Sequence, residues 1–83
     1  MYKVIIVEDE PWSRRGLINT FSWENYGFTL VAEFETAEEA KEYILKETPD
    51  VVFTDVNLSG ISGLQLIKEL NDMDVKKCKY III

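Results

Sequence analysis

The chain alternates between strand-like and helix-like segments, and this order constrains its fold more than any other feature. Short runs rich in β-branched and aromatic residues are separated by longer stretches whose apolar residues recur at helical spacing. The expected strands are Lys3–Val7, Thr29–Phe34, Val51–Thr54 and Tyr80–Ile83. Such a βαβαβαβ order predicts an α/β fold with a parallel sheet, right-handed crossovers and helices on both faces.

Local signals mark the start of each intervening helix. Pro11 suits a first helical turn, where the backbone N–H that proline lacks would have no partner. Two capping boxes follow, because Thr36 precedes Glu39 by three residues and Ser62 precedes Gln65 by the same spacing. The expected helices are therefore one that begins at Pro11, one over Ala37–Lys46 and one over Gly63–Met73.

Composition and charge exclude several classes of site. The 83 residues include no histidine, so the chain itself holds neither a Ser-His-Asp triad nor a histidine zinc site. The net charge of −6 disfavours a direct nucleic-acid surface and attraction to anionic lipid. No apolar run approaches the length of a membrane span, and the single cysteine, Cys78, fits a reducing compartment. We therefore expect a cytoplasmic protein without membrane contact.

Acidic residues follow two of the expected strands. Glu8, Asp9 and Glu10 come directly after the first strand, and Asp55 follows the third. Ligands of parallel sheets bind beyond the carboxyl ends of the strands, so Glu8, Asp9 and Asp55 converge if these two strands are neighbours. Carboxylates held together repel one another unless a cation lies between them, and an all-oxygen set favours Mg²⁺. The alternative, that these acids stabilise a helix N-terminus, stays open for Glu10 above all.

Two segments together resemble the receiver domain of two-component response regulators. Lys3–Pro11 (KVIIVEDEP) is similar to the first strand and acidic pair of that family, and Pro49–Gly63 (PDVVFTDVNLSGISG) is similar to its phosphoacceptor strand and loop. The resemblance implies a flavodoxin-like sheet in strand order 2-1-3-4-5. Residues 1–83 would then form a receiver domain with order 2-1-3-4 that lacks the last helix, strand and helix.

The resemblance also implies a function and a set of site residues. Asp55 would accept a phosphoryl group from a sensor histidine kinase, in a switch domain rather than an enzyme. Asp9, Asp55 and the backbone carbonyl of Asn57 would bind Mg²⁺ directly, and Glu8 would act on it through water. The hydroxyl and lysine residues that complete the family's switch would lie beyond Ile83.

A further segment, Trp23–Phe28 (WENYGF), resembles a subclass of receivers joined to AraC-type DNA-binding domains. This resemblance implies a transcriptional output and contact with DNA only through an effector domain outside the chain. The alternative is that the aromatic residues Trp23, Tyr26 and Phe28 simply pack a turn against the core.

Two other functions compete with the receiver function. A Mg²⁺-dependent phosphatase would carry a second acid two residues after its nucleophile, but that position is Asn57, which cannot exchange protons. A truncated receiver-like module could instead self-associate without phosphotransfer. The fourth strand, Tyr80–Ile83, would be a bare edge for a homodimer. On a face without a closing helix, Ile5 or Val7 and part of the Ile81–Ile83 set would face water.

Overall fold

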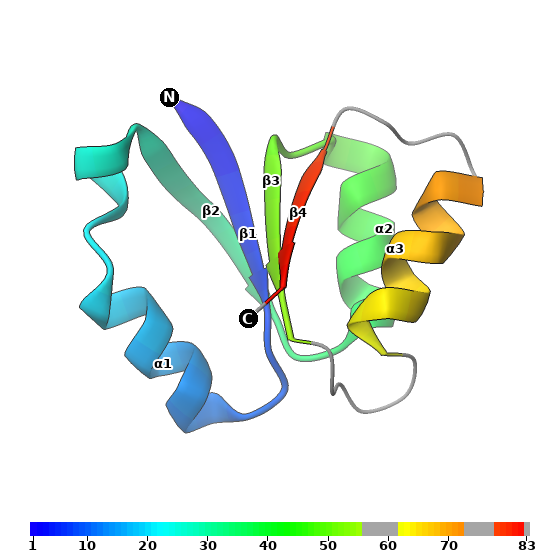
Figure 1. Cartoon of the computed structure of the whole chain (residues 1–83), viewed down its shortest axis with the longest axis horizontal. Coiled ribbons are helices and arrows are strands. Elements are labelled where there is room, and N and C mark those ends of the chain that lie inside the picture. The colour runs from blue at the N-terminus through cyan, green and yellow to red at the C-terminus, as the bar shows by residue number, and fades with distance from the viewer. Residues whose placement is uncertain (56–61, 73–77, 83) are drawn as a thin grey trace.

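The computed structural model describes residues 1–55, 62–72 and 78–82. Its elements follow the expected alternation of strands and helices, with one short 3₁₀ helix, η1, added between α1 and β2 (Figure 1). The elements are β1 (Tyr2–Val7), α1 (Pro11–Thr20), η1 (Trp23–Tyr26), β2 (Phe28–Phe34), α2 (Ala37–Glu47), β3 (Val51–Thr54), α3 (Gly63–Asp72) and β4 (Lys79–Ile82). The predicted α/β architecture is confirmed.

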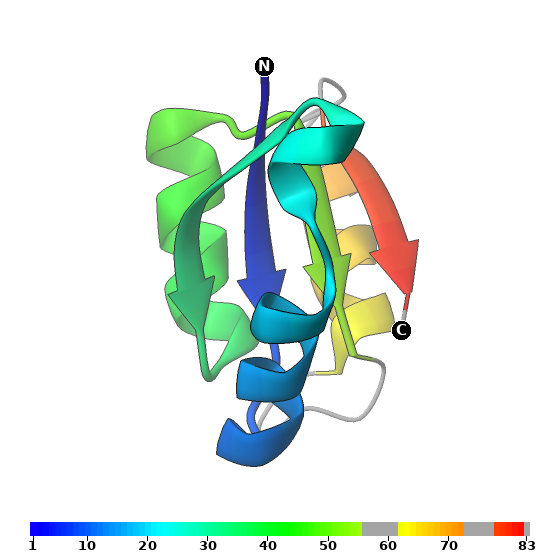
Figure 2. The ribbon, with the colours of Figure 1, turned by 90° about the vertical axis from the view of Figure 1, so that its left-hand side faces the viewer.

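The four strands form a single parallel sheet in the order β2-β1-β3-β4. This order is the one that the receiver resemblance implied for the first four strands. The arrowheads of all four strands in Figure 2 point the same way, so their carboxyl ends share one edge of the sheet. β1, β2 and β4 each begin one residue earlier than expected, and Ile83 lies outside the described residues.

Helices cover both faces of the sheet. α2 and α3 lie on one face, and α1 with η1 lies on the other (Figures 1 and 2). The core between the sheet and α2 and α3 consists of Ile5, Val7, Ala37, Ala40, Ile44, Val52, Leu66, Leu70 and Cys78. The core on the opposite face, toward α1 and η1, consists of Val4, Ile6, Trp23, Val51 and Phe53.

The expectation that Ile5 or Val7 would face water is wrong. Both side chains are fully buried, because they point toward α2 and α3. The expected exposure on β4 is confirmed, because Ile81 and Ile82 are 40% and 41% exposed. Both residues lie on an outer strand of the described sheet.

A β-bulge lies at the middle of β2. Val4 pairs with Leu30 but the next residue, Ile5, pairs with Ala32, so Val31 has no partner in the β1 ladder. An unpaired extra residue reverses the facing of every side chain after it. Leu30 therefore packs on the α1 side of the sheet, whereas Ala32 packs on the α2 side.

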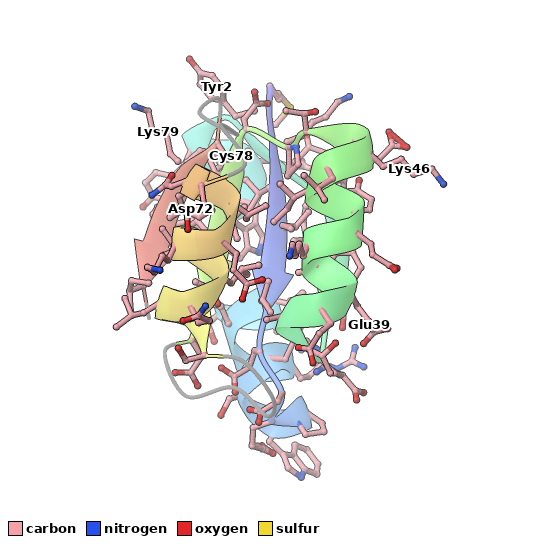
Figure 3. All side chains as sticks on the ribbon, turned by 90° about the vertical axis from the view of Figure 1, so that its right-hand side faces the viewer. Tyr2, Glu39, Lys46, Asp72, Cys78 and Lys79 are labelled. Carbon is pink, nitrogen blue, oxygen red and sulfur yellow. The ribbon has the colours of Figure 1, made fainter. Side chains whose placement is uncertain are left out.

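The predicted capping residues act at the helix starts. The Thr36 hydroxyl accepts from the Glu39 N–H at 3.2 Å, and the Ser62 hydroxyl accepts from the Gln65 N–H at 3.1 Å. α2 also carries acids in its first turn and Lys46 in its last, which complements the helix dipole. Glu39 and Lys46 lie at opposite ends of α2 in Figure 3.

The aromatic turn between α1 and β2 forms part of the core. Trp23 is 8% exposed, and its ring meets Phe53 edge-on with centroids 5.2 Å apart. Its indole N–H donates to the Ile18 carbonyl at 3.2 Å. Gly27 closes the turn with a φ of 79°, a left-handed conformation that would be strained for a residue with a side chain. The packing explanation is thus confirmed for Trp23, and Phe28 packs partly against the same cluster, but Tyr26 is 65% exposed.

Among the described residues, no helix has the length and apolar character needed to cross a bilayer.

Candidate metal and phosphoryl site

The backbone of the sheet brings the ends of β1 and β3 together. Val7 and Thr54 are register partners, and the pairing continues for one more residue because the Asp55 N–H donates to the Val7 carbonyl at 3.1 Å. On the other side of β1, the Glu8 N–H donates to the Phe34 carbonyl at 3.0 Å. Glu8 and Asp55 are therefore fixed as neighbours by main-chain hydrogen bonds from three strands.

Three carboxylates gather at this edge, as the sequence predicted. One carboxylate oxygen from each of Glu8, Asp9 and Asp55 lies within 4.8 Å of the others. Glu8 is 5% exposed, whereas Asp9 and Asp55 are half-buried. Asn57, whose carbonyl was the fourth expected ligand, lies outside the described residues.

The electrostatics of the cluster oppose its full ionisation. Burial raises the pKa of Glu8 above its usual value, and so do a side-chain hydrogen bond with Asp55 and the charges of Asp55 and Asp9. The Glu10 N–H, which donates to the Glu8 carboxylate at 3.1 Å, acts in the opposite direction. A cation among the three groups would relieve their repulsion, and an all-oxygen set fits a hard divalent ion such as Mg²⁺.

Glu10 does not belong to this cluster. Its carboxylate accepts from the Trp12 N–H at 3.0 Å and so caps α1, which supports the helix-terminus alternative for this residue. Trp12 itself is 84% exposed at the start of α1.

The start of α3 packs directly against the end of β3. A Cβ atom at Gly63 would collide with the backbone carbonyl of Asp55 and would lie 3.0 Å from the Thr54 hydroxyl oxygen. Thr54 is fully buried, and its hydroxyl donates to the same Asp55 carbonyl at 3.1 Å. The backbone of Asp55 therefore contacts both the Thr54 hydroxyl and the start of α3, and this close packing leaves no room for a side chain at residue 63.

Arg14 is not among the site residues that the sequence predicted. Its side chain is only 14% exposed, and its Nη1 donates to the Glu8 carbonyl at 2.7 Å. A signal was present, because Arg14 precedes Leu17 by three residues and Ile18 by four. It therefore lies on the α1 face that packs against the sheet.

Comparison with known proteins agrees with this geometry. Residues 4–83 match the response regulator receiver domain. The chain belongs to this family. A solved receiver domain, that of the response regulator AraT from Geobacillus stearothermophilus, superposes with a TM-score of 0.86 at 33% identity. The match covers 98% of this chain and 62% of that one.

Curated relatives of this receiver are longer proteins. An uncharacterized response regulatory protein of Staphylococcus epidermidis is 36% identical over all of this chain, which spans 32% of that relative. The uncharacterized transcriptional regulatory protein YesN of Bacillus subtilis is 35% identical over 86% of this chain, which amounts to 19% of YesN. The receiver thus spans a fifth to a third of the length of these relatives.

Proposed function

We propose that this receiver accepts a phosphoryl group on Asp55 from the phosphohistidine of a sensor histidine kinase. The observation that carries the proposal is the convergence of Glu8 and Asp9 on Asp55, at strand ends tied together by backbone hydrogen bonds. Of the three acids, Glu8 is the least suited to attack a donor because it is almost fully buried. The family motif favours Asp55 over Asp9 as the acceptor.

The proposed reaction is a direct transfer. An Asp55 carboxylate oxygen forms a bond to phosphorus while the bond between phosphorus and the histidine nitrogen breaks, which leaves an acyl phosphate and a histidine. The residues proposed to hold Mg²⁺ are Asp9, Asp55 and the carbonyl of Asn57, with Glu8 acting through water. Bound there, the ion would supply positive charge to phosphoryl oxygens as charge develops on them.

Phosphotransfer is the direct test. The receiver should gain the mass of one phosphoryl group when incubated with Mg²⁺ and a phosphorylated sensor kinase. Asp55→Asn should abolish the gain, and Asp9→Asn should reduce it strongly while leaving the fold intact by circular dichroism. Phosphorylation that persists in Asp55→Asn at another residue would refute the assignment.

Binding of Mg²⁺ can be measured separately from transfer. Mg²⁺ should raise the melting temperature of the native chain, because it relieves repulsion among the carboxylates, and Asp55→Asn should remove most of that shift. An equal shift in the variant would exclude Asp55 from the site.

The output of the switch is proposed to be transcriptional. Relatives such as YesN are named as transcriptional regulatory proteins, and the net charge of −6 argues against DNA binding by this receiver itself. DNA contact would therefore pass through an effector domain, for which the AraC type remains a prediction. A cytoplasmic location belongs to the same proposal.

A second candidate function is an interaction module that self-associates without phosphotransfer. The observation in its favour is the exposure of Ile81 and Ile82 on an outer strand. Self-association that is unaffected by Asp55→Asn, together with no phosphorylation under any donor, would favour this alternative.

A further inference from the structure

Arg14 links three separate segments around the acidic cluster. Its Nε donates to a Glu33 carboxylate oxygen at 2.9 Å, and its Nη2 lies 3.7 Å from a carboxylate oxygen of Glu35. Its Nη1 donates to the backbone carbonyl of Glu8 at 2.7 Å. One guanidinium on α1 thus joins the end of β1 to β2 and to the turn that follows β2.

These contacts fix the backbone of Glu8 from both sides. The Glu8 N–H is bonded to the Phe34 carbonyl, and the Glu8 carbonyl is bonded to Arg14. The Glu8 side chain in turn accepts from the Glu10 N–H. The turn that carries Glu8 and Asp9 is therefore tied to β2 as well as to its own helix.

A turn of this kind needs such a restraint. Two of the three clustered carboxylates belong to it, and like charges held within a few ångströms push the turn away from Asp55. The planar fork of arginine can hold a carbonyl and a carboxylate at once, which a lysine ammonium does with much less directional control.

We propose that Arg14 is a positioning residue that holds Glu8 and Asp9 in place around Asp55, so that the cluster is prepared for Mg²⁺ before the ion binds. The inference rests on the proposed function, since it concerns the same site. It differs from an electrostatic role in the sign of its effect. A nearby positive charge acting through the field alone opposes a divalent cation, so its removal would tighten Mg²⁺ binding.

The experiment compares Mg²⁺ affinity in the 83-residue chain for Arg14→Ala and Arg15→Ala by calorimetric titration. Both variants lose one positive charge from α1, but Arg15 is exposed whereas Arg14 is largely buried against the acidic turn. We expect Arg14→Ala to bind Mg²⁺ about tenfold more weakly, the range found for groups that orient metal ligands. Arg15→Ala should bind with unchanged or slightly higher affinity, and Arg14→Lys should fall between Arg14→Ala and the native chain.

A second variant, Glu33→Gln, tests the inference even if Arg14→Ala does not fold. Glu33→Gln leaves Arg14 in place but removes its carboxylate partner on β2, and it should weaken Mg²⁺ binding in the same direction by a smaller factor. Amide resonances of Glu8 and Glu10 should move in Arg14→Ala and stay in Arg15→Ala before any Mg²⁺ is added. Affinity in a folded Arg14→Ala within twofold of the native value, or higher, would overturn the inference. Absence of Mg²⁺ binding in the native chain would instead overturn the metal part of the proposed function.

Discussion

At the scale of single residues, Glu8 places a carboxyl group where its ionisation costs stability. Its pKa in the folded chain is raised, chiefly by burial and further by Asp55 and Asp9. The folded state therefore binds a proton more tightly than the unfolded state. Stability should therefore fall as pH rises from the unfolded pKa through the folded one.

We predict that Glu8→Gln stabilises the metal-free chain at pH 7. The amide oxygen can still accept from the Glu10 N–H, while the buried negative charge is removed. The melting temperature should rise by a few degrees, since about 1 kcal/mol corresponds to roughly 4–8 °C in a domain of this size. Glu42→Gln, an exposed substitution with the same change in charge, serves as the control. The prediction would be contradicted if Glu8→Gln and the native chain had equal melting temperatures over the whole range from about pH 4, near the usual pKa of Glu, to about pH 8.

Gly63 offers a second test at this scale. We predict that Gly63→Ala destabilises the chain by about 1–3 kcal/mol, because the new Cβ must displace the Asp55 carbonyl or the start of α3. Gly16→Ala is the matched control in α1, where a Cβ would meet nothing within 4 Å. That control should be neutral or up to about 1 kcal/mol more stable through helix propensity. Urea unfolding measures the stability of both variants. Equal stabilities would show that the Asp55 carbonyl and the start of α3 can move apart at little cost.

At the scale of elements, the bulge at Val31 decides which side chains of β2 reach which face. We predict that deletion of Val31 leaves the chain folded, because it removes only the extra residue. Leu30 and Ala32 become consecutive and still pair with Val4 and Ile5, so the facing of Ala32 and of the residues after it is kept. Val31→Thr, which keeps the residue count at a position 39% exposed, should change stability by less than about 0.5 kcal/mol. Circular dichroism and amide spectra distinguish the outcomes. A deletion variant that fails to fold would mean that the sheet needs the extra residue, for example for its local twist.

The same strand marks the limit of what the sequence predicted. Hydrophobic runs and capping residues located the main elements, because those signals are local. The bulge was invisible because an alternating pattern in β2 looks the same whether its apolar residues share one face or divide between two. Glu8, Asp9 and Asp55 were found because they directly follow strands. Arg14 was missed because its partners are set by the tertiary packing of α1 on β2.

At the scale of the whole molecule, the two outer strands differ in their protection. β2 carries the bulge and the charged Glu33, both of which discourage pairing with another sheet. Within the part of the chain that the structure describes, β4 is the other outer strand, and it exposes Ile81 and Ile82. The homodimer through β4 remains a prediction, and this asymmetry supports it.

We predict that Ile82→Lys shifts the chain toward the monomer, since a lysine on an edge strand opposes strand pairing. Leu64→Lys adds the same charge at an exposed apolar position on α3 and should leave association unchanged. Light scattering on a sizing column over a range of concentrations measures both. A native chain that stays monomeric at high micromolar concentration would rule out the β4 homodimer.

The two tryptophans have a practical consequence for all of these measurements. Trp12 lies in water two residues after the acidic turn ends at Glu10, while Trp23 is buried against Phe53 on the strand that leads to Asp55. Their emission spectra should therefore differ, with the solvated indole emitting at longer wavelength than the enclosed one. Single Trp→Phe replacements would separate the two signals. One optical experiment could then follow events at the start of α1, next to the acidic turn, and in the core independently, without any attached label.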